Sequence, residues 1–180
     1  MIIETERLIL RPFRVEDAES IYEYAKDLDV GPGAGWPPHD SLETSREVIK
    51  NVLMVPYTYA VCLKSDNKAI GSISLMIGKN SNFGIGENEA ELGFWIGKPF
   101  WGNGYIKEAS LALLEKGFGK MRLERIWCAH LDENMKSARV QEKCGFRFHH
   151  KERKYWKIHG EEKSETVNVI ERSEWEKTQE

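Results

Sequence analysis

The hydrophobic pattern changes its period within one stretch of the chain, residues 89–119. From residue 89 to residue 96 apolar and polar positions alternate, which predicts a β-strand. Its apolar face carries Ala90, Leu92, Phe94 and Ile96. From Ile106 the apolar spacing becomes helical, and the segment Trp101-Gly102-Asn103-Gly104-Tyr105 lies between the two patterns. A glycine turn before a helix favours anion binding, because glycines allow close approach and the first helical N–H groups lack partners.

An ordinary strand-to-helix turn is the alternative interpretation of this stretch. The segment is not a Walker loop, since no Lys-Ser/Thr pair follows the glycines, and it does not have the three glycines of the dinucleotide motif. From the physics of the turn alone, both interpretations stay open.

The rest of the chain predicts further strands and helices in a mixed order. Apolar runs and turn residues predict strands at 8–11, 57–63, 69–77, 125–131, 146–158 and 164–170. Helical spacing predicts helices at 15–28, at 41–53 with Ser41 as its N-cap, and from 132 or 134 to Cys144, with Gly145 as the left-handed residue that ends the last one. The charged last ten residues are expected to fray, apart from a docked Trp175. This order predicts a mixed α/β fold of about seven strands and four helices in a single domain, 1–180.

Composition narrows the function classes. Of the 180 residues, 41% are hydrophobic and 31% are charged, as in an ordinary globular protein. A net charge of −3 argues against a nucleic-acid surface. There is no apolar run of membrane length and no signal peptide at the start, so we expect no membrane association. The odd number of cysteines, without CxxC spacing, fits a reducing cytoplasm better than disulfides or a metal site.

Several motifs together resemble the GNAT acetyltransferases, and most closely their RimJ/RimL-type branch of ribosomal-protein N-terminal acetyltransferases. The motifs are Thr5 to Phe13, Glu91-Leu92-Gly93-Phe94, Trp101 to Tyr105, Asn134-x-x-Ser137 and Glu142-Lys143-Cys144-Gly145-Phe146. The resemblance implies a central mixed sheet splayed between its fourth and fifth strands. It also implies acetyl-CoA as acetyl donor without a metal, and a primary amine, here a protein N-terminal α-amine, as acceptor. A second copy of the chain, as a homodimer, is a candidate partner.

The resemblance also assigns residues to the donor. The backbone of Phe94, Trp95 and Ile96 would hold the pantetheine arm, and Asn134 would contact the cofactor. The pyrophosphate would lie on the turn formed by Trp101, Gly102, Asn103, Gly104, Tyr105 and Ile106. This turn departs from the family pattern, since Trp101 replaces a hydrogen-bonding Gln or Arg and Ile106 replaces a small residue. Asn134 has a second interpretation as a plain helix N-cap.

Glu91 is the candidate general base. The acceptor amine must be neutral to attack, and a free amine with a pKa near ~10 is protonated at neutral pH. Strand alternation places Glu91 opposite the apolar face, although a solvated carboxylate is the alternative. The family's tyrosine acid corresponds to Gln141, so we expect direct attack, with the leaving thiolate protonated by water.

The acceptor side is less defined. Trp36, Glu89 and Trp95 could contact the acceptor, or the tryptophans could simply pack in the core. A small amine (an antibiotic, a polyamine or an amino acid) is the alternative acceptor, and a non-catalytic acyl-CoA-binding module is the alternative class.

Two further residue pairs are expected to be structural. Cys128 and His130 share a strand face about 7 Å apart, which favours core packing over a nucleophilic pair. The neighbouring His149 and His150 are expected on opposite faces of a strand, a poor arrangement for a metal.

Overall fold

The computed structural model describes residues 1–178 and has a mixed α/β fold. Its described part contains eight strands and five α-helices, one more of each than the sequence predicts. The chain divides into two compact units. The first comprises Met1–Ser74 and Phe94–Ala109, and the second comprises Leu75–Gly93 and the chain from Ser110 onward. Strands β4 (Ala69–Ile77) and β5 (Glu89–Ile96) each pass through both units, and a single domain over 1–180 stays a prediction.

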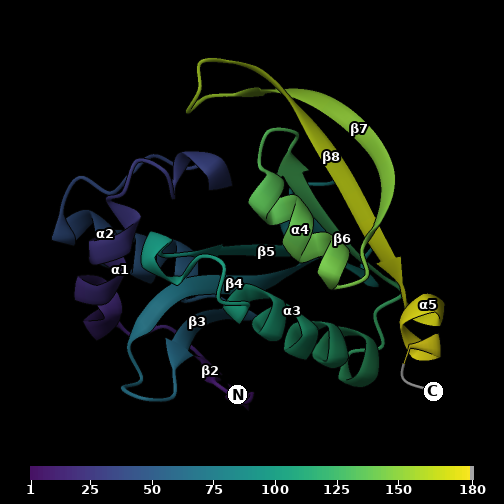
Figure 1. Cartoon of the computed structure of the whole chain (residues 1–180), viewed down its shortest axis with the longest axis horizontal. Coiled ribbons are helices and arrows are strands. Elements are labelled where there is room, and N and C mark those ends of the chain that lie inside the picture. Colours follow the sequence, from purple (N-terminus) through teal and green to yellow (C-terminus); the bar gives the residue numbers. More distant parts are fainter. Residues whose placement is uncertain (179–180) are drawn as a thin grey trace. The chain divides into compact units, whose positions relative to one another are not determined.

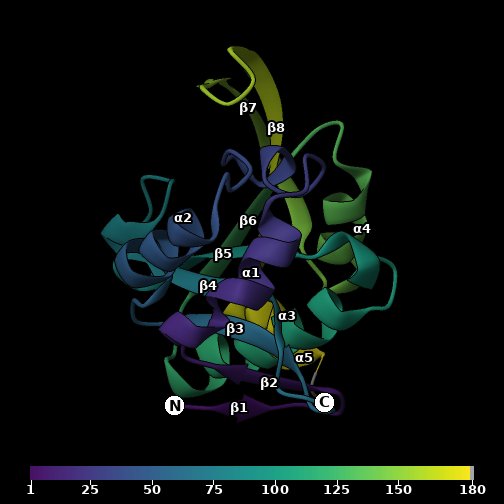
Figure 2. The same ribbon diagram turned by 90° about the vertical axis from the view of Figure 1, so that its left-hand side faces the viewer.

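The first unit is built on antiparallel strands that Figure 2 shows one after another from the N-terminus. They are β1 (Ile3–Glu4), β2 (Leu8–Arg11), β3 (Thr58–Leu63) and the first part of β4. The register places Leu10 opposite both Ile3 and Val61. Alternation of β2 buries Leu8 and Leu10 completely. The two-residue strand β1 has no hydrophobic period of its own, and it was not predicted.

The two helical segments of the first unit begin where the sequence predicts. The first ends earlier than predicted, and the second ends at Leu53 as predicted. Helix α1 (Ala18–Ala25) follows a 3₁₀ turn at Val15–Asp17, and α2 (Leu42–Val48) continues into a π-helical turn at Ile49–Leu53. The Ser41 hydroxyl caps α2 by accepting a hydrogen bond from the Thr44 N–H at 3.1 Å, as expected. The predicted extension of α1 to residue 28 is wrong. There the Asp27 carboxylate accepts from the Asp29 N–H at 2.8 Å, which competes with the helix.

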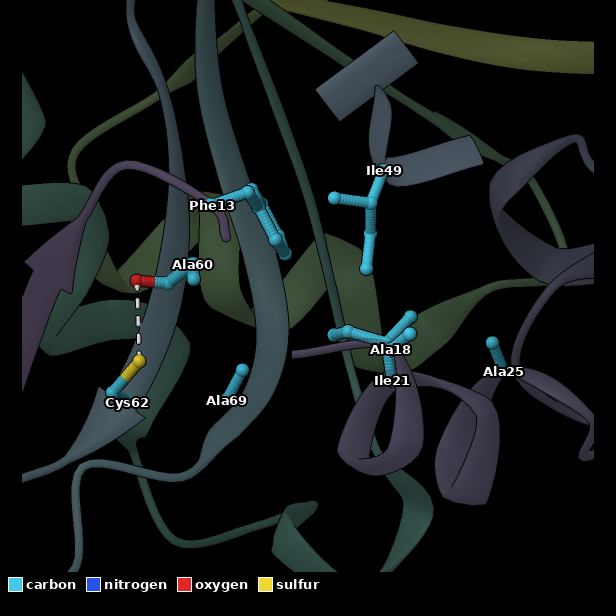
Figure 3. Packing of buried hydrophobic residues seen from close by; sticks show 8 residues of the cluster. All are labelled: Phe13, Ala18, Ile21, Ala25, Ile49, Ala60, Cys62 and Ala69. Atoms are coloured by element: carbon cyan, nitrogen blue, oxygen red, sulfur yellow. Dashed lines mark hydrogen bonds between the residues drawn. The ribbon is translucent and has the colours of Figure 1, made fainter. Parts of the chain in front are cut away.

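The core of this unit lies between its helices and strands β3 and β4 (Figure 3). It consists of Phe13, Ala18, Ile21, Ala25, Ile49, Ala60, Cys62 and Ala69. The small residues on α1, β3 and β4 let the backbones approach closely, and Phe13, Ile21 and Ile49 fill the remaining volume. The Cys62 thiol lies 3.9 Å from the Ala60 carbonyl oxygen, and burial raises its pKa to about 11.

The second unit contains the strand pair at which the sheet splays. Strand β5 is parallel to β6 (Arg125–Leu131), but their pairing covers only Glu89–Glu91 against Arg125–Trp127. These are the fourth and fifth predicted strands, so the expected splay is confirmed. Strand β6 then pairs along its whole length with β8 (Glu161–Glu171), which pairs with β7 (Arg147–Trp156). Figure 1 shows β7 and β8 as a long curved hairpin with its turn at the end away from α5.

Three helices complete the chain. Helix α3 (Tyr105–Glu115) leads into a π-helical turn at Lys116–Lys120, and α4 (Met135–Lys143) ends before Gly145, whose φ of +90° confirms the predicted left-handed residue. The predicted fraying is wrong for α5 (Arg172–Lys177), and the predicted docking of Trp175 is confirmed, because the centre of its ring lies 5.5 Å from that of Phe118. The last two residues of that prediction lie outside the described part. Within residues 1–178 no helix has the length and apolarity to cross a membrane.

Candidate active site

The glycine turn has the backbone conformation that an anion site requires. Gly102 and Gly104 both have φ +79°, a left-handed conformation that favours glycine. A Cβ on Gly102 would meet nothing within 4 Å, so the turn is open on that side. The N–H of Glu108 donates to the Gly104 carbonyl at 3.0 Å and forms the first bond of α3. The N–H groups of Tyr105 and Ile106 therefore precede the intrahelical ladder.

Arg7 braces this turn, and sequence reasoning missed it. Its Nη1 donates to the Asn103 carbonyl at 3.0 Å, and its Nε donates to Glu108 Oε2 at 2.7 Å. The guanidinium carbon also lies 4.6 Å from the centre of the Tyr105 ring. The only signal was the opening motif around Arg7, which gave a family resemblance and no contact.

The end of β5 is fixed by two tryptophans. The Trp101 indole N–H donates to the Ile96 carbonyl at 2.9 Å, so Trp101 does make a hydrogen bond, although to the chain itself. Trp95 packs edge-to-face on Trp36 at 5.2 Å, and both rings pack against the core of the first unit. These contacts favour packing for Trp36 and Trp95. Phe94, which directly precedes Trp95 on the strand, is half-buried.

Glu91 is a buried carboxylate held by the loop that precedes its strand. Only 8% of its surface is exposed, so it is not a solvated strand residue. Oε2 accepts hydrogen bonds from the Ser81 hydroxyl at 2.8 Å and the Asn82 N–H at 2.6 Å. The Asn82 side-chain amide donates to Oε1 at 3.1 Å. Glu91 is also the last β5 residue that pairs with β6. The sequence indicated only a polar loop here, with no sign that Ser81 and Asn82 would orient Glu91.

Glu89 has partners of its own. The Trp127 indole N–H donates to its Oε2 at 2.8 Å, and Arg125 Nη1 lies 3.3 Å from its Oε1. Its carboxylate therefore links β5 to β6 beside their paired residues.

Asn134 and Gln141 belong to α4 and its connections. The Asn134 side chain accepts from the Ser137 N–H at 3.1 Å, which confirms the N-cap interpretation. Gln141 is 1% exposed, and its amide donates to the Ala129 carbonyl at 3.1 Å and accepts from the Asn168 side chain at 2.7 Å. Gln141 thus ties α4 to β6 and β8, and the position is closed to solvent.

Two residue pairs singled out in the sequence remain, Cys128 with His130 and His149 with His150. Cys128 is buried, and burial raises the pKa of its thiol, which disfavours the nucleophilic thiolate. The prediction for His149 and His150 is wrong. A β-bulge between Phe148 and His150 lets the two rings meet, with 2.8 Å between their Nδ1 atoms. Among residues 1–178 no group of three or more His, Cys, Asp or Glu side chains could hold a metal ion.

Comparison with known proteins decides the family. The model of the acetyltransferase (GNAT) domain matches residues 7–147. The chain belongs to the GNAT acetyltransferase family. It is therefore an N-acetyltransferase, and the mixed sheet described above is the GNAT fold, whose members use acetyl-CoA.

Three relatives illustrate this membership. YnaD of Bacillus subtilis (strain 168), named an uncharacterized N-acetyltransferase, is 33% identical over 148 residues, covering 82% of this chain and 83% of YnaD. A GNAT-family acetyltransferase from Bacillus anthracis has a crystal structure that superposes with a TM-score of 0.84 at 29% identity, covering 96% of this chain and 99% of that one. YdaF of B. subtilis, provisionally named a ribosomal N-acetyltransferase, is 35% identical over 81 residues, covering 45% of this chain and 42% of YdaF.

Proposed function

We propose that this GNAT enzyme transfers the acetyl group of acetyl-CoA to the α-amine of a protein N-terminus, as in the RimJ/RimL-type branch, with Glu91 as general base. The observation that carries the proposal is the placement of Glu91. Its carboxylate is buried and oriented by Ser81 and Asn82, on the strand that continues into the glycine turn. The partial similarity to YdaF supports an N-terminal acceptor.

Acetyl-CoA would be held mainly by backbone groups. We assign the pantetheine arm to the backbone of Phe94, Trp95 and Ile96, and the pyrophosphate to the turn from Trp101 to Ile106. Gly102 and Gly104 fit this role, because both have positive φ and the turn is open at Gly102. Asn134 caps α4 with its side-chain oxygen and is the proposed further contact. Bound acetyl-CoA would supply the thioester whose carbonyl carbon is attacked.

Glu91 would remove the acceptor's proton. An α-amine has a pKa of about 7.7–8.0, so most of it is protonated at pH 7 and a base accelerates attack. Oε2 of Glu91 receives three hydrogen bonds, whereas Oε1 receives one, from the Asn82 amide. Oε1 therefore keeps a lone pair for the proton. The amine nitrogen then bonds to the acetyl carbon, the C–S bond breaks, and the nitrogen gives up its second proton to water as the CoA thiolate leaves. Water protonates it, since Gln141 is a buried amide.

The acceptor contacts and setting are also proposals. Trp36 and Trp95 are half-buried, so part of each ring could contact an acceptor while the rest packs in the core. Glu89 could add negative charge near the acceptor, although Arg125 offsets that charge. We place the reaction in the cytoplasm, because Cys62, Cys128 and Cys144 are buried thiols that form no disulfide. A homodimer stays a prediction.

The test is CoA-thiol release with matched acceptors. We expect acetyl-CoA turnover with a short peptide carrying a free N-terminus and none with the same peptide blocked by a formyl group. Turnover with spermidine or a free amino acid, but not with the peptide, would transfer the proposal to a small-amine acceptor. Tight CoA binding without turnover on any primary amine would favour a non-catalytic acyl-CoA-binding module.

A further inference from the structure

A lysine of the β7–β8 hairpin lies in a site built for a primary ammonium. The Nζ of Lys154 is 2.6 Å from Oε2 of Glu165. The same nitrogen is 5.9 Å from the centre of the Phe83 ring and 5.7 Å from that of Trp156. Phe83, Trp156 and Glu165, all in the second unit, form what we call the ammonium cage.

The chemistry of the cage suits a desolvated –NH₃⁺ group. Aromatic faces within about 6 Å attract a cation, and a carboxylate adds a charge-assisted hydrogen bond. Glu165 is only 4% exposed, so it needs a cation close by to remain charged. Lys154, in contrast, leaves 42% of its side chain exposed. Because a lysine chain is long and flexible, it can leave toward the solvent and vacate the cage.

The cage adjoins the proposed base. Burial raises the pKa of Glu165, the ion pair with Lys154 opposes that rise, and the negative charges of Glu152 and Glu91 add to it. Phe83 of the cage directly follows Asn82, whose backbone N–H and side-chain amide bind the Glu91 carboxylate, so one loop supplies both the cage and the support of Glu91. The Glu152 and Glu91 charges each disfavour a charged Glu165, and a cation in the cage offsets that repulsion.

A second observation in the cage points to a ligand. The indole Nε1 of Trp156 is buried and has no hydrogen-bond acceptor within the described part of the chain. A buried donor without a partner is costly, so it marks a position where a further group would be stabilised. In a peptide N-terminus, a carbonyl oxygen lies three bonds from the ammonium nitrogen and could accept a hydrogen bond from this indole N–H. A simple alkylamine has no such oxygen.

We propose that the ammonium cage binds the α-ammonium of the acceptor, and that Lys154 is an intramolecular occupant which the acceptor displaces. The inference rests on the proposed function and identifies its acceptor subsite. An α-ammonium in the cage contacts Phe83, the residue that follows Asn82, which orients Glu91. Glu91 then removes the proton of that ammonium, and Lys154 excludes amines that bind more weakly than its own ammonium.

Binding measured without acetyl-CoA tests the cage separately from catalysis. The probe is Ala-Ala-Ala amide, titrated calorimetrically into the full chain. Lys154→Met removes the competitor and should tighten binding by roughly 10- to 100-fold, the factor by which the competitor reduces the vacant fraction. The matched control is Lys163→Met, because Lys163 lies on the same hairpin and pairs with Glu133 and Glu161 outside the cage. It should leave the affinity unchanged, and the N-acetylated peptide should not bind.

A second variant keeps the test valid if Lys154→Met folds poorly. Glu165→Gln and the double variant Lys154→Met with Glu165→Gln bury no unpaired charge, and both should lose peptide binding at least tenfold. Unchanged or weaker binding in folded Lys154→Met, or wild-type affinity in Glu165→Gln, would overturn the cage. Peptide binding that behaves as predicted without CoA release would uphold the cage and refute the proposed function. Peptide turnover that is unchanged in Glu165→Gln would uphold the proposed function and refute the cage.

Discussion

Asn82 holds Glu91 with both its backbone and its side chain, through an N–H at 2.6 Å from Oε2 and an amide at 3.1 Å from Oε1. We predict that Asn82→Ala lowers kcat/KM by roughly 10- to 100-fold, because a base that turns away from its proton loses most of its effect. Acetyl-CoA affinity should not change. Steady-state kinetics with Asn80→Ala as control, at an exposed position of the same loop, checks this. Equal kinetics for the two variants would mean that the amide does not orient Glu91.

Gly104→Val should weaken acetyl-CoA binding while the protein stays folded. The new side chain blocks the turn, and the φ of +79° adds strain of about 1–2 kcal/mol. Gly160→Val is the matched control, because Gly160 also has a positive φ, +67°, in the hairpin turn and is not one of the residues assigned to the pyrophosphate. Both variants should lose similar stability in urea unfolding, but only the first should lose CoA affinity in calorimetry. Unchanged affinity in Gly104→Val would place the phosphates elsewhere.

Arg11→Met should destabilise the protein by about 3–5 kcal/mol, because it leaves a buried carboxylate without its cation. Arg11 donates to both carboxylate oxygens of Asp17, at 2.7 and 2.8 Å, and both residues are buried. Arg46→Met removes an exposed pair with Glu43 and should cost at most about 1 kcal/mol. Free energies of unfolding in urea compare the two. Similar small losses would show that Asp17 is satisfied without Arg11.

Cys62 should stay unreactive well into the alkaline range. Its pKa of about 11 leaves roughly 1% thiolate at pH 9, against about half for a thiol with an ordinary pKa of about 9. The raised pKa also links Cys62 to folding stability. The stabilisation that comes from keeping the thiol protonated in the folded state is complete below about pH 9 and is lost as the pH rises through about 11. Iodoacetamide labelling at pH 9, with Cys62→Ala to assign the label, checks this. Rapid labelling of the folded protein would contradict it, whereas labelling in concentrated urea is expected.

Much of the fold follows from local patterns in the sequence. Strand β6 was predicted with its observed bounds, and Ser41, Asn134 and Gly145 were identified as helix-end residues, because each acts on neighbours in the chain. The errors arise where a local hydrogen bond or a β-bulge changes the backbone against the hydrophobic pattern. Asp27 ends α1 early, and the bulge at His149 brings two histidines together. The docking of α5 through Trp175 depends on Phe118, more than fifty residues earlier in the chain.

The candidate site shows the same limit. Glu91 and the glycines could be identified from alternation and motif, but their supports could not. Asn82 binds Glu91 across a loop, and Arg7 reaches Asn103 from nearly a hundred residues away. The ammonium cage joins Phe83, Trp156 and Glu165, and no local period connects them.

The pH dependence of Glu91→Gln tests the central claim most directly. With a peptide acceptor, kcat/KM at pH 7 should fall by roughly 10²–10⁴-fold, and the deficit should shrink above about pH 8, where the α-amine is already neutral. Acetyl-CoA affinity should be unchanged. Glu89→Gln, on the same strand and face, should leave kcat nearly unchanged and act at most on the KM of the acceptor, because that carboxylate binds Arg125 and Trp127. Near-normal activity of Glu91→Gln at pH 7, or a deficit that does not vary from pH 6 to pH 9, would show that Glu91 is not the base.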